Sequence, residues 1–135
     1  MATFTRLEEI NAWVKARELN GLIYKLINEG TFAKDFSLRN QINRSSGSVM
    51  DNIAEGFERG GKNEFVNFLG IARGSLGEVK SQLFRAFDRK HITEQAFKTT
   101  FAITEETGRL ITGLITYLNQ SDIRGMKYKD RDNSV

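Results

Sequence analysis

The chain of 135 residues is 39% hydrophobic, which suits a single domain with one core. It has no cysteine, so a disulfide framework and a cysteine-based zinc site are excluded. No apolar run approaches the roughly 20 residues of a membrane-spanning helix, and the N-terminus lacks the apolar segment of a signal peptide. We therefore expect a cytoplasmic protein. Its net charge is only +3, although the pI is near 9.3, which leaves room for an anionic partner.

Two stretches in the first half of the chain place apolar residues at helical spacing. The first predicts a helix over residues 8–29, followed by a short loop over 30–34. The second predicts a helix over 35–58, with Asp35 or Ser37 as its N-cap. The chain contains no proline, so nothing interrupts long helices.

Two further helices are predicted in the second half, over residues 62–89 and 93–119, the latter with Thr93 as N-cap. Short connections favour neighbouring helices that run in opposite directions. We therefore expect an all-α, antiparallel, up-down-up-down four-helix bundle over residues 1–120. Residues 121–135 are polar and aperiodic, which predicts a flexible tail.

A row of small residues lies on the third predicted helix, nearly opposite its apolar face. Each glycine inside a helix costs roughly 1 kcal/mol relative to alanine. Close approach of a helix from a second subunit would offset that cost, so the row predicts an oligomer. The alternatives are a tolerated surface, or packing within the subunit. The row consists of Gly70, Gly74, Gly77 and Ser81.

A polar stripe on the second and third helices predicts a hydrogen-bond network between them. A buried carboxylate in this stripe needs a cationic partner, and Arg44 or Arg73 could supply it. An acid–base pair in a cleft is the less favoured alternative, because structural ion pairs have the same composition. The stripe comprises Arg44, Ser48, Asn52 and Glu55 on the second helix, with Ser75, Glu78 and Gln82 on the third.

Several common sites are not indicated by the sequence. The chain has one histidine and no Glu-x-x-His motif, which argues against a di-iron bundle site. No phosphate-binding glycine loop is present, so we expect neither metal nor cofactor. Arg85 and His91 have the loose spacing of the Arg-x(4–6)-His element in HEPN-type RNases. A surface arginine and a histidine at a helix C-terminus are the favoured explanation of this pair, because two residue types at loose spacing match often by chance and Ala86 after Arg85 is not polar. We therefore expect no enzyme and keep an RNase using Arg85 and His91 as a minor alternative.

Basic residues gather on the second and third helices, diluted by acidic ones. A solvated surface is the simplest interpretation, and contact with phosphates from several subunits is the functional one. The residues expected to contact nucleic acid are Arg39, Arg44, Arg73, Lys80 and Arg85.

Four motifs together resemble the four-helix-bundle proteins encoded in intervening sequences of bacterial 23S ribosomal RNA genes. The resemblance covers residues 4–119. The motifs are Trp13-Val14-Lys15-Ala16, Leu38-x-x-Gln41-x-x-Arg44, Asn52-Ile53-Ala54-Glu55-Gly56 and Phe68-Leu69-x-Ile71-Ala72-Arg73-Gly74-Ser75-Leu76-x-Glu78.

This resemblance implies a ring-like homopentamer with a central channel and a basic surface, and no established enzymatic activity. By fold, it also implies similarity to the accessory proteins of diversity-generating retroelements, which bind nucleic acid. We therefore expect a homo-oligomer that binds RNA or another nucleic acid. The alternative is a scaffold whose ligand is another protein.

Overall fold

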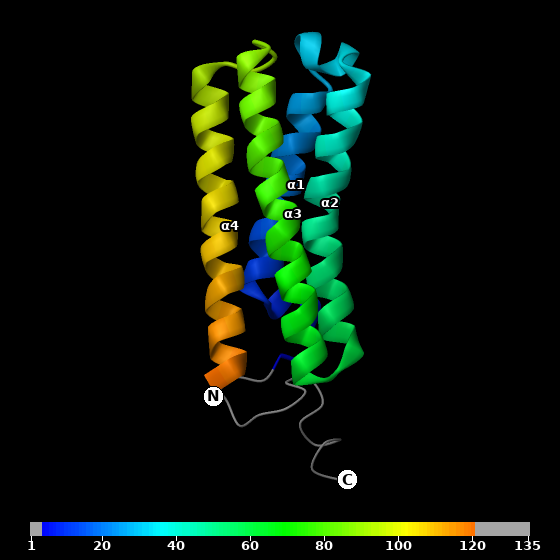
Figure 1. Cartoon of the computed structure of the whole chain (residues 1–135), viewed down its shortest axis with the longest axis vertical. Coiled ribbons are helices and arrows are strands. Elements are labelled where there is room, and N and C mark those ends of the chain that lie inside the picture. The colour runs from blue at the N-terminus through cyan, green and yellow to red at the C-terminus, as the bar shows by residue number, and fades with distance from the viewer. Residues whose placement is uncertain (1–3, 121–135) are drawn as a thin grey trace.

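A computed structural model describes residues 4–120, which form four long α-helices with no strand among them (Figure 1). The expected all-α four-helix bundle is confirmed. The predicted tail, 121–135, lies outside the described residues. The elements are two short 3-10 helices, η1 (Leu7–Glu9) and η2 (Gly30–Lys34), and four α-helices, α1 (Asn11–Ile27), α2 (Phe36–Arg59), α3 (Lys62–Asp88) and α4 (Glu94–Gln120).

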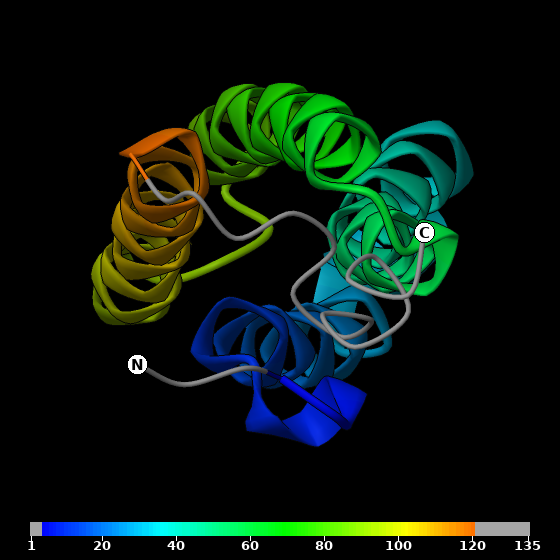
Figure 2. The same cartoon turned by 90° about the horizontal axis from the view of Figure 1, so that it is seen from below.

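Viewed along its long axis, the bundle places the four helices around a common core in the order α1, α2, α3, α4 (Figure 2). In Figure 1 the connection between α2 and α3 lies at the lower end of the bundle. The connections between α1 and α2 and between α3 and α4 lie at the upper end. Each helix packs against the next one along the chain, and α1 also packs against α4, which closes the bundle.

The helix ends follow local capping chemistry. The Asp35 carboxylate accepts a hydrogen bond from the Leu38 N–H at 3.3 Å, and the Thr93 hydroxyl accepts one from the Ala96 N–H at 3.1 Å. Gly60 ends α2 with φ of 88°, a left-handed conformation that glycine adopts without a steric cost. The bounds of α2, α3 and α4 differ from expectation by one residue at most. The larger differences are that the loop over 30–34 is the 3-10 helix η2, and that α1 spans Asn11–Ile27 rather than 8–29, with residues 7–9 forming η1.

The buried residues of α1 are all apolar, whereas α2, α3 and α4 also bury polar side chains. Side chains such as Leu19, Ile42 and Leu83 are completely buried. On α4 the buried set includes only two large apolar residues, together with Thr100, Thr104 and Thr107. The Thr104 and Thr107 hydroxyls donate to carbonyls of their own helix at 2.8 and 2.7 Å. These hydroxyls therefore satisfy their hydrogen-bonding needs without forming a bond to another helix.

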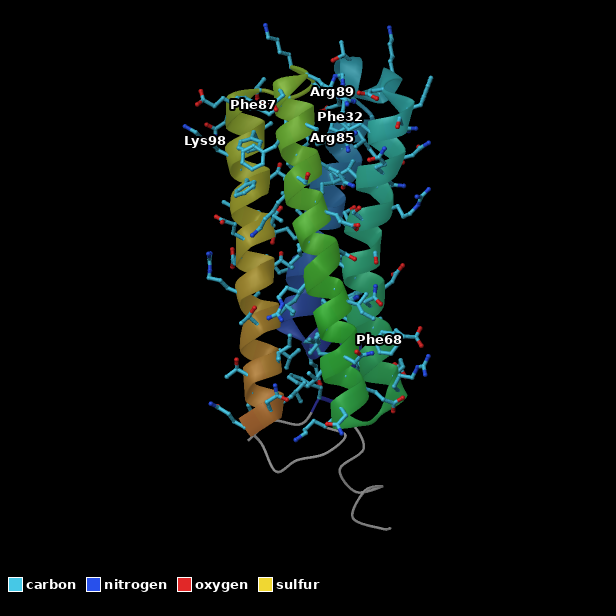
Figure 3. All side chains as sticks on the ribbon, in the orientation of Figure 1. Phe32, Phe68, Arg85, Phe87, Arg89 and Lys98 are labelled. Carbon is cyan, nitrogen blue, oxygen red and sulfur yellow. The ribbon has the colours of Figure 1, made fainter. Side chains whose placement is uncertain are left out.

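Among the described glycines, the most crowded is Gly56, where α2 meets α3. A methyl group added to Gly56 would lie 2.7 Å from Phe68 Cβ and 3.1 Å from Phe65 Cδ1. Phe68 lies near the lower end of the bundle (Figure 3), and the Arg59 guanidinium lies 5.2 Å from its ring centre. Glycine is therefore required here by helix packing rather than by backbone conformation.

Replacing Gly56 with alanine should destabilise the fold by about 1–3 kcal/mol, since the added methyl group overpacks the contact with Phe68. The matched control is Gly47→Ala in the same helix, where an added methyl group meets nothing within 4 Å. That change should stabilise the protein by about 0.4–1 kcal/mol. Urea denaturation measures both, and equal effects of the two substitutions would contradict the close contact.

A cluster around Asp35 ties the connection between α1 and α2 to the end of α3. Asp35 Oδ2 accepts hydrogen bonds from His91 Nε2 and from Arg89 Nη1, both at 2.8 Å. The His91 ring stacks on Phe32, with 5.2 Å between ring centres, and its Nδ1 lies 2.8 Å from Thr31 Oγ1. Phe32 and Arg89 lie together at the upper end of the bundle (Figure 3). The cluster thus fixes the end of the bundle opposite Gly56.

The hydrogen bond from His91, followed by that from Arg89, lowers the pKa of Asp35 from 3.8 to about 2. Because this folded-state pKa lies below the unfolded one, the carboxylate stabilises the fold above about pH 4. That contribution is lost as the pH falls toward 2.

Asp35→Asn should therefore lower the melting temperature at pH 7, and its difference from the natural protein should shrink between pH 4 and pH 2. Asp51→Asn is the matched control, because Asp51 is exposed on α2 and has no hydrogen bond or ion pair within residues 4–120. Thermal unfolding followed by circular dichroism measures both. A difference that stays constant from pH 7 to pH 2 would contradict the linkage.

Candidate nucleic-acid interface

An open groove of about 570 Å³ runs between α3 and α4. Three of its lining residues are glycines and three are cations. The glycines are Gly77, Gly108 and Gly113, and the cations are Arg73, Lys80 and Arg109. The groove therefore combines glycines, which place no side chain in it, with basic side chains.

The groove is open because its glycines leave space that no neighbouring side chain fills. A methyl group added at Gly77 or Gly113 would meet nothing within 4 Å, and one at Gly108 would make only ordinary contact with Leu76 Cδ1, at 3.7 Å. These glycines therefore do not set the spacing between α3 and α4. Their effect is to keep the groove unobstructed.

The cations of the groove are not neutralised by neighbouring carboxylates. Arg73 Nη1 donates a long hydrogen bond of 3.3 Å to Thr112 Oγ1, and Lys80 Nζ lies 6.0 Å from the ring centre of Phe101. Arg109 makes no hydrogen bond or ion pair within residues 4–120. Glu105 is the one acidic residue in the lining and forms no ion pair with them among the described residues. The groove thus keeps an excess of positive charge.

Two of the other basic residues expected to contact nucleic acid are engaged in holding the bundle together. Arg39 donates to the Ile27 carbonyl at 3.0 Å and to Asn28 Oδ1 at 2.8 Å, which closes the turn after α1. The half-buried Arg85 donates to Gln41 Oε1 at 2.8 Å and so links α3 to α2. Neither guanidinium lines the groove.

Arg109 joins the groove although it was not among the expected contacts. Its sequence signal is its place on α4, one residue after Gly108 and four residues before Gly113, beside the apolar stripe. This position points to the groove only once Gly108 and Gly113 of α4 are known to lie opposite Gly77 of α3.

The glycine row of α3 faces outward. Methyl groups added at Gly70, Gly74 or Gly77 would meet nothing within 4 Å, and Ser81 is exposed. Of these four residues only Gly77 lines the groove. No helix of the described chain packs closely on the row, so within this subunit its glycines serve no tight contact.

The polar stripe forms a small hydrogen-bond network between α2 and α3. Ser75 Oγ and Ser48 Oγ lie 3.0 Å apart across the two helices. Asn52 Nδ2 donates to the Ser48 carbonyl at 2.8 Å and to the Ser48 hydroxyl at 2.9 Å. Glu55 is half-exposed and pairs with Arg59 at 2.9 Å rather than with Arg44 or Arg73.

Arg44 and Glu78 are exposed and line a second pocket, of about 300 Å³, between α2 and α3. Neither side chain makes a hydrogen bond or an ion pair within residues 4–120. Gln82 also lines this pocket, and its buried Oε1 accepts no hydrogen bond from the described residues.

Arg85 and His91, the pair with RNase-like spacing, have separate partners. Arg85 binds Gln41, whereas both ring nitrogens of His91 are engaged by Asp35 and Thr31. The His91 side chain is only 11% exposed. The geometry of the two side chains therefore fits the packing of helix ends.

Within residues 4–120 no three His, Asp or Glu side chains are grouped so that they could hold a metal ion. In the same part of the chain, none of the helices combines the length and the apolar character needed to span a membrane.

The comparisons with known proteins agree with the fold. The comparison with curated proteins found no match. A solved structure similar to this chain is that of a protein of unknown function from the S23 ribosomal protein family of Bacteroides thetaiotaomicron. It has a TM-score of 0.73 and 24% sequence identity, and covers 78% of this chain and 95% of that one. The family model for the 23S rRNA-intervening sequence protein matches residues 8–113. The chain therefore belongs to the 23S rRNA-intervening sequence protein family.

Proposed function

We propose that this chain is a non-enzymatic RNA-binding protein of the cytoplasm, and that it acts as a homo-oligomer whose subunits pool their basic surfaces. The observation that carries this proposal is the groove between α3 and α4, where Arg73, Lys80 and Arg109 have no carboxylate partner. A groove of this kind can accept phosphates without first breaking an ion pair.

The side chains of the groove suit phosphate contact. Guanidinium groups can donate two parallel hydrogen bonds to one phosphate, and the lysine ammonium adds a point charge. Gly77 and Gly108 allow a phosphate backbone to approach the helices, because they place no side chain in its path. Each such contact releases counterions from the nucleic acid, so binding should weaken steeply as salt rises.

The proposed architecture is an antiparallel bundle that assembles into a ring of five subunits. The hydrogen bond from Arg85, near the end of α3, to Gln41, near the beginning of α2, supports the antiparallel order, as do connections at alternating ends of the bundle (Figure 1). The outward-facing glycine row supports the oligomer, because glycines that bring no gain within the subunit need one elsewhere. The number of subunits follows from the family resemblance alone.

The charge-removing double variant Lys80→Gln/Arg109→Gln should bind an RNA hairpin more weakly. The slope of log affinity against log salt should fall in magnitude by about 2, since two phosphate contacts are lost. The control is Lys25→Gln/Lys34→Gln, which removes the same charge from exposed positions on α1 and η2. Fluorescence anisotropy across a salt series measures both.

Equal affinity and equal slope in the two double variants would contradict phosphate binding in the groove. If the intact protein fails to bind RNA even at low salt, the proposal is wrong, and a scaffold for a protein partner becomes the better interpretation.

The oligomer can be tested at Gly74, which lies in the middle of the row. Gly74→Leu should reduce the mass of the particle in solution while leaving the bundle folded, because a bulky side chain cannot enter a close contact between subunits. Gly21→Leu on α1 is the matched control, since that glycine is also exposed with nothing within 4 Å. Sedimentation velocity measures the masses. Retention of the natural mass by Gly74→Leu would show that the row is not an interface.

A further inference from the structure

The basic groove continues into a cluster of aromatic rings on the same side of the bundle. Phe84 packs against Phe97 and Phe101, with ring centres 5.1 and 5.4 Å apart. Phe87 stacks on Phe97 at 5.0 Å, and Phe97 stacks on Phe101 at 5.3 Å. Phe87 lies at the upper end of α3, beside α4 (Figure 3). We call these four residues the aromatic cluster.

Helical spacing makes the groove and the aromatic cluster one continuous surface. On α3, residues 73, 77, 80, 84 and 87 follow one another at steps of three or four, so they share one face of the helix. On α4, residues 97, 101, 105, 108 and 112 do the same. Lys80 belongs to both parts, since it lines the groove and its Nζ lies over the Phe101 ring. From residue 73 to residue 87 this surface is about 21 Å long.

Two rings of the aromatic cluster remain open to solvent. Phe84 is 49% exposed and Phe87 is 36% exposed, although each packs against a ring of α4. Exposed phenylalanine keeps apolar area in contact with water, and the cations beside it lack a negatively charged partner. A ligand with both apolar faces and negative charge would satisfy both. Nucleotides have both: flat bases that stack, and phosphates.

We propose that the surface formed by the groove and the aromatic cluster binds single-stranded RNA, with unpaired bases stacked on Phe84 and Phe87 and phosphates held by the cations of the groove. This inference rests on the proposed function and adds the class of RNA to it. In a duplex the faces of the bases are covered by their neighbours, so only the cations could act. Unpaired bases present their faces to aromatic side chains, which adds affinity that a duplex cannot gain.

The test compares a fluorescein-labelled uridine 12-mer with a 12-base-pair RNA duplex, on the full chain at fixed salt. Phe84→Leu keeps an apolar side chain but removes the stacking surface. It should weaken binding of the uridine 12-mer at least fivefold and leave duplex binding unchanged. Phe36→Leu is the matched control, because Phe36 is 66% exposed at the start of α2. It should change neither affinity.

A second variant checks that lost binding reflects lost stacking and not a damaged fold. Phe84→Trp should retain the affinity for the uridine 12-mer. Its added tryptophan fluorescence, measured as the difference from the natural protein with Trp13 alone, should be quenched by the 12-mer and not by the duplex.

The possible failures are distinguishable. If Phe84→Leu weakens both RNAs equally, or weakens neither, stacking on the aromatic cluster is wrong while phosphate binding in the groove can still stand. If Phe84→Trp fluorescence does not respond to the 12-mer although binding persists, the bases do not reach this ring. If neither RNA binds the natural protein at low salt, the proposed function itself fails.

Discussion

The packing of α2 against α3 is the constraint on which the rest of the structure depends. Gly56 lets the two helices come together at one end, Ser48 and Ser75 are hydrogen-bonded between them, and Arg85 binds Gln41 nearer the other end. These contacts fix the rotation of α3 about its own axis. Once one side of α3 is committed to α2, the side that carries Arg73 and Lys80 must line the boundary with α4.

The two sides of α3 therefore have different kinds of surface. Toward α2, Ser75 and Arg85 are matched by hydrogen bonds to Ser48 and Gln41 and many apolar groups are buried, beside the smaller pocket that Arg44, Glu78 and Gln82 line. Toward α4, glycines and unpaired cations leave a groove, and the phenylalanines beyond it are only partly covered. A surface that the subunit itself leaves unsatisfied is where an external ligand gains most from binding.

Most of the fold could be predicted from the sequence, because helical periodicity and capping are local. Asp35 and Thr93 cap the helices that were expected to begin beside them. The hydrogen-bond partners of individual arginines could not be predicted, since Arg39 and Arg85 bind groups that only the folded chain brings near them. Gly56 and the three glycines of the row on α3 look alike in sequence. Of these four, only Gly56 closely contacts a neighbouring helix, because the contact depends on the rotation of each helix about its axis.

The threonines in the core of α4 mean that the two helices lining the groove are not packed equally well into the bundle. The hydroxyl groups of Thr104 and Thr107 donate hydrogen bonds to carbonyls of their own helix. These two side chains therefore stabilise the packing of α4 only through the small apolar area of their methyl groups. Local opening should therefore cost α4 less free energy than α3, and amide exchange should be faster along it. The wall of the groove formed by α4 should then yield to a ligand more easily than the wall formed by α3.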